Sequence, residues 1–204
     1  MKIYALSIVL TPEGGSAKVL NSASDLSSFS FYQRGTISEF LTFFSGLVAE
    51  RTQPGERQSF TDVDKQDSEY VFHVYNRGGD ERLAAVMVSD KEYPRRPAFS
   101  VLTKSIETFS NKVPTSSFSN PSSIDFPDLK EFLANYQDPR NADSIMKLQQ
   151  ELDETKIVMH QTIESVLKRG EKLEDLVARS DALGAQSKRF YVTAKKQNSC
   201  CVVM

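Results

Sequence analysis

The chain has 204 residues, with 25 Lys and Arg against 27 Asp and Glu and a formal net charge of −2. This length suits one domain of ordinary size plus an extension, and the near-neutral charge gives no electrostatic case for a nucleic-acid partner. No apolar run approaches the ~18 residues that a membrane-spanning helix needs. The two cysteines are adjacent and cannot staple a fold, so a reducing compartment such as the cytosol is expected.

The N-terminal part of the chain predicts two strands and a helix. Residues 2–10 are rich in aliphatic side chains and predict a strand, and residues 17–20 predict a short second strand after a Gly-containing turn. The Ser- and Phe-rich stretch 21–34 has no clear period and is expected to be irregular or a broken strand. A helix is predicted over 36–51, with Thr36 and Glu39 placed to form a capping box.

One aromatic residue lies off the apolar face of this predicted helix. Phe40 and Phe44 share a stripe at helical spacing, whereas Phe43 lies roughly 120° from its centre. A large aromatic side chain at that position either packs on a second buried flank or is exposed for a partner. We therefore take Phe43, with Phe40 and Phe44 beneath it, as a candidate docking patch.

The remainder of the globular part predicts three strands and then two helices. The middle strand carries apolar side chains on both faces, which indicates helices on both sides of the sheet. His73 lies in that strand and is interpreted as a packed core residue, because the only other histidine, His160, falls in the distant C-terminal segment. The fold class is α+β: an antiparallel sheet with one helix on one face and two on the other. The predicted ranges are 57–63, 69–76, 82–89, 98–112 and 128–136.

Residues 145–197 carry a heptad pattern, which predicts one long helix whose apolar seam needs partner helices from outside the segment. Arg169 stands in the middle of the seam, in step with Val166 and Leu173. A buried guanidinium must meet acceptors in the partners, because an unpaired buried charge is costly. If the heptad positions are instead assigned one residue away, Arg169 lies outside the apolar seam and is exposed to solvent. The other seam positions are Ile145, Leu148, Leu152, Thr155, Met159, Thr162, Val166, Leu173, Leu176, Ser180, Leu183, Ser187, Phe190, Ala194 and Gln197.

The C-terminal tail carries a lipidation signal. Cys201 is followed by two aliphatic residues and a terminal Met, a pattern typical of prenylation and, with Met last, of a farnesyl group. A chance match to so short a pattern is the alternative. Because one isoprenoid gives only marginal anchoring, Cys200 is the natural site for a second lipid, palmitoyl or another prenyl group.

Four stretches together resemble a known family. Residues 1–6 (MKIYAL), 151–156 (ELDETK), 169–173 (RGEKL) and 195–201 (KKQNSCC) are similar to the prenylated longin-type R-SNAREs, and the resemblance covers essentially the whole chain. It implies a longin domain of profilin-like shape over 1–137, an R-SNARE coiled-coil motif over 138–199 and a lipidated tail over 200–204.

The resemblance also implies a function in vesicle docking and membrane fusion. The helix would zip with three Q-SNARE helices of the target membrane into a parallel four-helix bundle, with Arg169 in the central layer facing three Gln side chains. Family members act at the Golgi, endosomes, vacuole or lysosome and on ER-derived vesicles, and SNARE-disassembly machinery is an expected partner. No metal, nucleic acid or cofactor beyond covalent lipid is implied.

A lipid-anchored adaptor with a homodimeric coiled coil is the rival hypothesis. A homodimer would stack two Arg169 guanidinium groups, and it would place Thr155, Thr162 and Ser180 in a two-stranded core. Small and polar seam residues suit a larger bundle better. An enzyme is disfavoured, because the sequence holds no catalytic constellation, phosphate-binding loop or metal-spaced cluster.

The exposed seam and the lipid pose an energetic problem before fusion. Each CH₂ removed from water is worth about 0.8 kcal/mol, so an isoprenoid and an apolar seam left in water are costly. We therefore expect a closed form in which the long helix folds back on the globular domain, with Phe43 at the contact.

Overall fold

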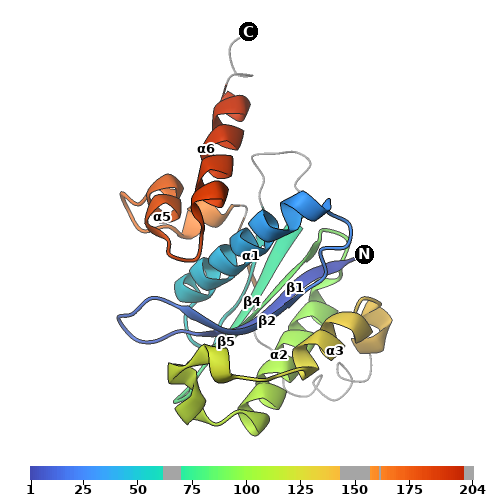
Figure 1. Ribbon diagram of the computed structural model, residues 1–204. Helices are drawn as coiled ribbons and strands as arrows, with labels where there is room; N and C mark the ends of the chain where they lie inside the picture. Colours follow the sequence, from blue (N-terminus) through green and yellow to red (C-terminus); the bar gives the residue numbers. More distant parts are fainter. Residues whose placement is uncertain (62–69, 143–156, 161, 200–204) are drawn as a thin grey trace.

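The computed structural model describes residues 1–61, 70–142, 157–160 and 162–199, with the backbone alone over 195–199. One six-stranded sheet in the order β2-β1-β5-β4-β3-β6 forms its centre (Figure 1). The first five strands are antiparallel, as expected, whereas the sixth pairs parallel to β3 and comes from the segment expected to be helical. The strands are β1 (Ile3–Leu10), β2 (Lys18–Ser24), β3 (Arg57–Thr61), β4 (Tyr70–Gly78), β5 (Leu83–Asp90) and β6 (Ile157–His160).

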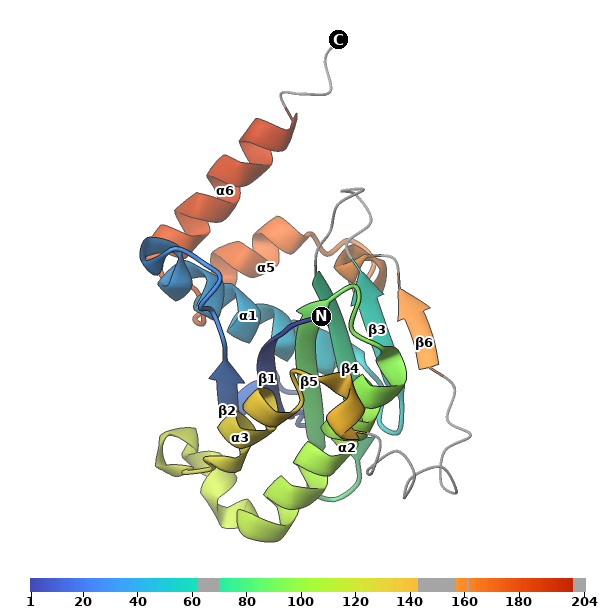
Figure 2. The ribbon, with the colours of Figure 1, turned by 90° about the vertical axis from the view of Figure 1, so that its right-hand side faces the viewer.

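Helices cover both faces of the sheet. Helix α1 (Phe31–Arg51) lies across one face, and α2 (Arg95–Lys112) and α3 (Asp128–Asn135) lie across the other (Figures 1 and 2). Between and after α2 and α3 the chain makes short 3-10 turns, η1 (Thr115–Ser119), η2 (Pro121–Ser123) and η3 (Pro139–Ala142). The predicted arrangement of one helix against two is confirmed.

The core divides into two clusters, one under each helical layer. The larger cluster joins β1 and β5 to α2 and α3, and the smaller one joins Val48 and Ala49 of α1 to Phe60 and Val74. Every residue of β5 except Asp90 is buried, which is the pattern of a central strand covered on both faces.

His73 is a packed core residue, as the sequence predicted. Its ring is 1% exposed, its Nδ1 lies 2.9 Å from the hydroxyl of Ser59, and its Nε2 lies 3.3 Å from that of Ser89. Burial lowers the pKa of His73 to about 3, so the ring is neutral at physiological pH. Its polar atoms are satisfied across three adjacent strands.

The boundaries of β2, α1 and α2 differ from those expected. The stretch 21–34 is irregular only over 25–30, because β2 runs on to Ser24 and α1 begins at Phe31, with Ser30 rather than Thr36 at its N-cap. Strand pairing with β1 supplies backbone hydrogen bonds that a local period cannot reveal. Helix α2 likewise begins three residues early, at Arg95, with Pro97 inside its first turn.

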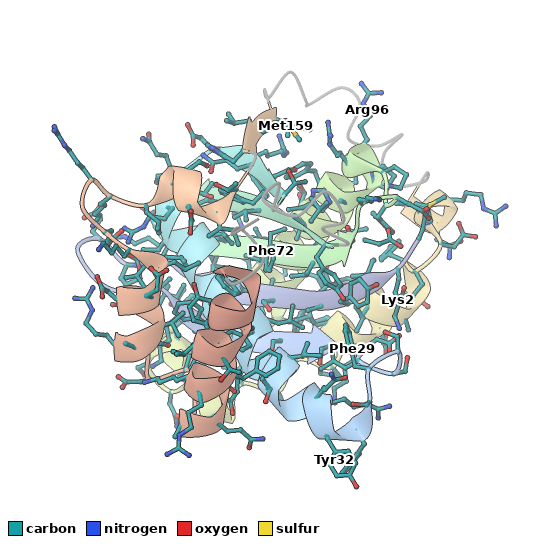
Figure 3. All side chains as sticks on the ribbon, turned by 90° about the horizontal axis from the view of Figure 1, so that it is seen from above. Lys2, Phe29, Tyr32, Phe72, Arg96 and Met159 are labelled. Atoms are coloured by element: carbon teal, nitrogen blue, oxygen red, sulfur yellow. The ribbon has the colours of Figure 1, made fainter. Side chains whose placement is uncertain are left out.

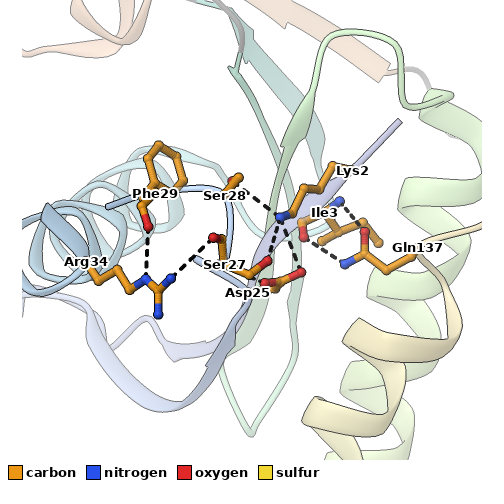
Figure 4. A network of polar contacts seen from close by, with 8 residues as sticks. All are labelled: Lys2, Ile3, Asp25, Ser27, Ser28, Phe29, Arg34 and Gln137. Carbon is orange, nitrogen blue, oxygen red and sulfur yellow. Dashed lines mark hydrogen bonds and ion pairs between the residues drawn. The ribbon is translucent and has the colours of Figure 1, made fainter. Parts of the chain in front are cut away.

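The end of the globular domain is tied to its beginning. The side-chain amide of Gln137 accepts from the backbone N–H of Ile3 at 2.9 Å and donates to the Ile3 carbonyl at 2.8 Å (Figure 4). This side chain therefore pairs with β1 as a strand backbone would.

Candidate functional site

The segment that carries the heptad pattern is not one helix in this chain on its own. Its described part forms the strand β6, the turn η4 (Ile163–Val166) and the helices α5 (Leu173–Arg179) and α6 (Ala185–Ser199). The expectation of an unbroken helix over 145–197 is therefore not met. The physical reason is that an apolar stripe without partner helices is better buried against the domain than left in water.

Strand β6 extends the sheet at the edge of β3. Thr61 donates to the carbonyl of His160 at 3.3 Å, and the ring of His160 stacks on Phe60 with centroids 4.9 Å apart and planes 10° apart. His160 is thus not distant from the domain, as the sequence suggested, but lies against its smaller core cluster. Ile163 and Val166 of η4 pack against that cluster as well. This edge would otherwise present unpaired backbone groups.

An ion pair joins the end of α1 to the loop before α5. The guanidinium Nη2 of Arg51 donates to both carboxylate oxygens of Glu171 at 3.0 Å, and its Nη1 lies 3.2 Å from Glu50. The side chains of Arg51 and Glu171 are 9% and 20% exposed. A partly buried, two-bonded pair of this kind is stronger than an exposed one. Glu171 is only two residues from Arg169.

A carboxylate of α1 accepts hydrogen bonds from the start of α6. Glu39 Oε2 accepts from the backbone N–H of Gly184 at 2.7 Å, and the buried hydroxyl of Ser187 also donates to this carboxylate. The hydrogen bonds from Ser187 and then from Gly184 lower the pKa of Glu39. Glu39 therefore satisfies orphan donors at a helix N-terminus that lies 145 residues away in the chain.

Aromatic side chains complete the contact between α1 and α6. The ring of Phe40 lies 6.4 Å from that of Phe190 and 6.3 Å from that of Tyr191. Phe44 lies 6.2 Å from Phe40 and continues the row inward to Phe72 on β4 at 6.0 Å.

Phe43 stands beside this row. Its ring makes an edge contact with Phe44 at 5.1 Å, and its side chain is neither buried nor fully exposed. The candidate patch thus lies on the helix that receives α6, and Phe40 is the patch member whose ring meets α6 directly.

The described seam residues spread over several elements. Arg169 lies exposed in the turn before α5, next to Gly170 with a φ of +86°, a conformation that favours glycine. Thr162 caps η4 by accepting from the Ser165 N–H at 3.2 Å, and Leu183 is buried. The remaining described seam residues are Met159 in β6, Val166 in η4, Leu173 and Leu176 in α5, Ser180 at its C-cap, and Ser187, Phe190, Ala194 and Gln197 in α6.

Some predicted site residues lie outside the described residues. These are the seam positions Ile145, Leu148, Leu152 and Thr155 and the two cysteines, Cys200 and Cys201. Within the part of the chain that the structure describes, no helix has the length and apolar character needed to cross a membrane.

Sequence reasoning missed the polar contacts that hold the segment. Arg51 and Glu171 carry no local signal, because each is an ordinary charged residue of a predicted helix. The local signal of Glu39 predicted a capping box with Thr36, whereas its carboxylate accepts from Gly184. Only the approach of residues more than a hundred positions apart reveals their pairing.

Two family models match the chain in the order that this architecture suggests. The longin model, described as a regulated-SNARE-like domain, matches residues 26–133, and the synaptobrevin model matches residues 144–202. A sheet covered by one helix and two helices, followed by a heptad segment with a central arginine, defines a longin-type R-SNARE.

The curated relatives extend over the whole chain. "Synaptobrevin homolog ykt6" of Schizosaccharomyces pombe is 53% identical over 204 residues, covering 100% of both chains. "Synaptobrevin homolog YKT6" of Debaryomyces hansenii and that of Eremothecium gossypii are 50% and 48% identical, again over 100% of both chains. The chain therefore belongs to this family of longin-domain synaptobrevin homologues, which are non-enzymatic SNARE proteins of vesicle trafficking.

Proposed function

We propose that this R-SNARE alternates between a closed form, described by the structure, and an open form that zips with three Q-SNARE helices. In the open form residues 145–197 make one helix of a parallel bundle, and Arg169 meets three Gln side chains in its central layer. The energy for fusion comes from burying the seam, because no chemistry in this chain supplies it.

One observation carries the proposal. Residues that the bundle would bury contact the longin domain instead: the buried Ser187 donates to Glu39 of α1, and Val166 packs on the domain core. The same side chains cannot face three partner helices and α1 together. The longin domain and the Q-SNAREs thus compete for one surface, and the longin domain inhibits assembly.

The geometry of the arginine supports this competition. In the closed form Arg169 is exposed, and the chain around it is a turn rather than a helix. An exposed guanidinium costs little, whereas a buried one must have acceptors, so Arg169 suits both states only if the open bundle supplies the glutamines. Zippering would then draw the C-terminal end toward the target membrane.

The anchor is proposed to be covalent lipid. Cys201 would carry a farnesyl group and Cys200 a palmitoyl or second prenyl group, because stable attachment takes two membrane signals. Such a chain would act at the cytoplasmic face of Golgi, endosomal, vacuolar or lysosomal and ER-derived vesicle membranes. After fusion the bundle would be taken apart by SNARE-disassembly machinery.

The test compares assembly by the full chain with assembly by the isolated segment 138–199. Each is mixed with the three Q-SNARE motifs, and bundle formation is followed by resistance to SDS. The segment should assemble several-fold faster, because no domain competes with the partners. Equal rates would overturn the inhibitory role.

Arg169→Leu tests the central layer in the same assay and in vesicle fusion. The variant should still form helix, but it should lose register and slow fusion with native partners. Arg169→Gln should be partly tolerated, and better tolerated when one partner carries a Gln→Arg exchange. Fusion by Arg169→Leu at the normal rate would contradict the seam assignment.

A further inference from the structure

Two adjacent aromatic residues at the start of α1 are exposed to solvent. Phe31 and Tyr32 are 79% and 89% exposed, and their rings make an edge contact at 5.9 Å. Figure 3 shows Tyr32 at the rim of the molecule, projecting beyond the helix that carries it. Neither ring contributes to the two core clusters. Helix capping does not require aromatic residues either. Neither core packing nor capping therefore explains why this pair is aromatic.

An open hollow lies beside the pair. It has a volume of about 680 Å³ and lies between α1 and the end of β2, lined in part by Ser24, Ser27, Arg34 and Ser38. On a helix, positions three, four and seven apart share a face, so Phe31 lies over the same side of α1 as Arg34 and Ser38. An apolar ring thus stands above a hydroxyl-rich wall.

The charged side chains that line the hollow are Arg34 and Asp25. The guanidinium of Arg34 donates to the backbone carbonyls of Phe29 at 3.0 Å and Ser27 at 3.3 Å, and none of the described carboxylates pairs with it (Figure 4). The carboxylate of Asp25 pairs instead with Lys2, which lies outside the hollow, at 3.4 Å. The guanidinium of Arg34 is therefore available to pair with an anionic group outside the chain.

The position of the pair relates it to the far end of the chain. Helix α1 begins at the upper end of the domain, which is the end from which α6 projects (Figure 1). The residues proposed to carry lipid follow α6 directly. A bilayer that held those lipids would therefore be reached from this end of the domain.

We propose that Phe31, Tyr32 and Arg34 form a second membrane contact, in which the two rings enter the interfacial region of an anionic bilayer and Arg34 meets lipid phosphate or carboxylate. Aromatic rings with one polar edge concentrate at that depth of a bilayer, and basic residues beside them gain from anionic lipid. The rings project from a convex rim rather than lining a groove, which suits a lipid surface better than a protein ligand. This inference rests on the proposed function, because only a membrane-attached chain holds this end beside a bilayer.

The test uses a single tryptophan in the full-length, unlipidated chain. The protein has no tryptophan, so Tyr32→Trp creates a unique fluorophore at the contact. With vesicles of phosphatidylcholine and phosphatidylserine its emission should shift to the blue and be quenched by lipids brominated on their acyl chains. Met159→Trp is the matched control and should do neither, because Met159 is also exposed but lies on the opposite side of the molecule (Figure 3).

Vesicle co-sedimentation supplies the affinity. Phe31→Ser with Tyr32→Ser should weaken binding at least about tenfold, since each ring loses apolar burial. Arg34→Ala should weaken binding to the anionic vesicles roughly fivefold and leave binding to pure phosphatidylcholine unchanged. Arg96→Ala removes an exposed cation of α2 on the opposite side and should change neither value (Figure 3).

The outcomes separate this contact from the SNARE function. The Phe31→Ser, Tyr32→Ser variant should assemble with Q-SNARE motifs as the unaltered chain does, so failed assembly of the unaltered chain would count against the proposed function alone. An unshifted Tyr32→Trp spectrum, or no binding to vesicles at all, would overturn the membrane contact. So would vesicle binding by the double variant at full strength, because the contact would then lie elsewhere.

Discussion

Reversing the charge of Arg51 should open the closed form. The guanidinium makes two hydrogen bonds of 3.0 Å to Glu171, and it is the polar link nearest to Arg169. Arg51→Glu would remove both bonds and set a third carboxylate beside Glu50 and Glu171. The domain core should tolerate the change, because Arg51 is the last residue of α1 and belongs to neither apolar cluster.

The magnitude follows from the exposure of the pair. An exposed ion pair is worth about 0.2–1 kcal/mol, whereas breaking a fully buried one costs about 3–5 kcal/mol. With side chains 9% and 20% exposed, Arg51 and Glu171 lie between these limits. We expect a loss of about 2 kcal/mol, in line with hydrogen bonds to charged groups, which is roughly a 30-fold fall in the ratio of closed to open form.

Hydrogen exchange of β6 measures this ratio. The amides of Ile157–His160 that point toward β3 are protected only while the segment is docked, so their exchange should accelerate roughly 30-fold in Arg51→Glu. The exchange variant Arg51→Glu with Glu171→Arg should recover most of the protection. Arg77→Glu is a matched control, because Arg77 pairs with Glu81 of the β4–β5 hairpin rather than with the segment. Unchanged protection in Arg51→Glu would refute the reasoning.

Three further predictions address the patch, the cap and the anchor. Phe43→Glu should raise the radius of gyration in solution X-ray scattering and increase membrane and Q-SNARE binding together; an already extended, unchanged protein would contradict the closed form. The lowered pKa of Glu39 means that its bonds to α6 are complete above the ordinary glutamate pKa and are lost as the pH falls through the lowered value, so the protection factor of the Gly184 amide, which is its exchange relative to the intrinsic rate at each pH, should fall in acid. In Glu39→Gln this acid dependence should be absent, and its persistence would assign the effect to another group. Cys201→Ser should leave the protein in the cytosolic fraction, and membrane retention equal to that of the unaltered chain would rule out Cys201 as the anchor.

Local pattern was enough to predict the globular domain. The middle strands carry apolar side chains on both faces, and such a strand has a stable place only between two helical layers, as β5 and its neighbours confirm. The 3.6-residue period of α2 and α3 placed both helices within a few residues. The start of α1 escaped prediction, because Phe31 and Tyr32 are exposed there and add nothing to an apolar face.

The structure of the heptad segment could not be predicted in this way, since the same sequence can pack against the globular domain or against partner helices. Its repeat determines that one stripe must be buried, but burial is non-directional and does not say against what. In the chain on its own, the free edge of β3 offers backbone partners to 157–160, Arg51 offers a charge to Glu171, and Glu39 offers a cap to α6. These contacts join residues about a hundred or more positions apart, and so only the tertiary structure could decide between a strand, short helices and the long helix that partners would favour.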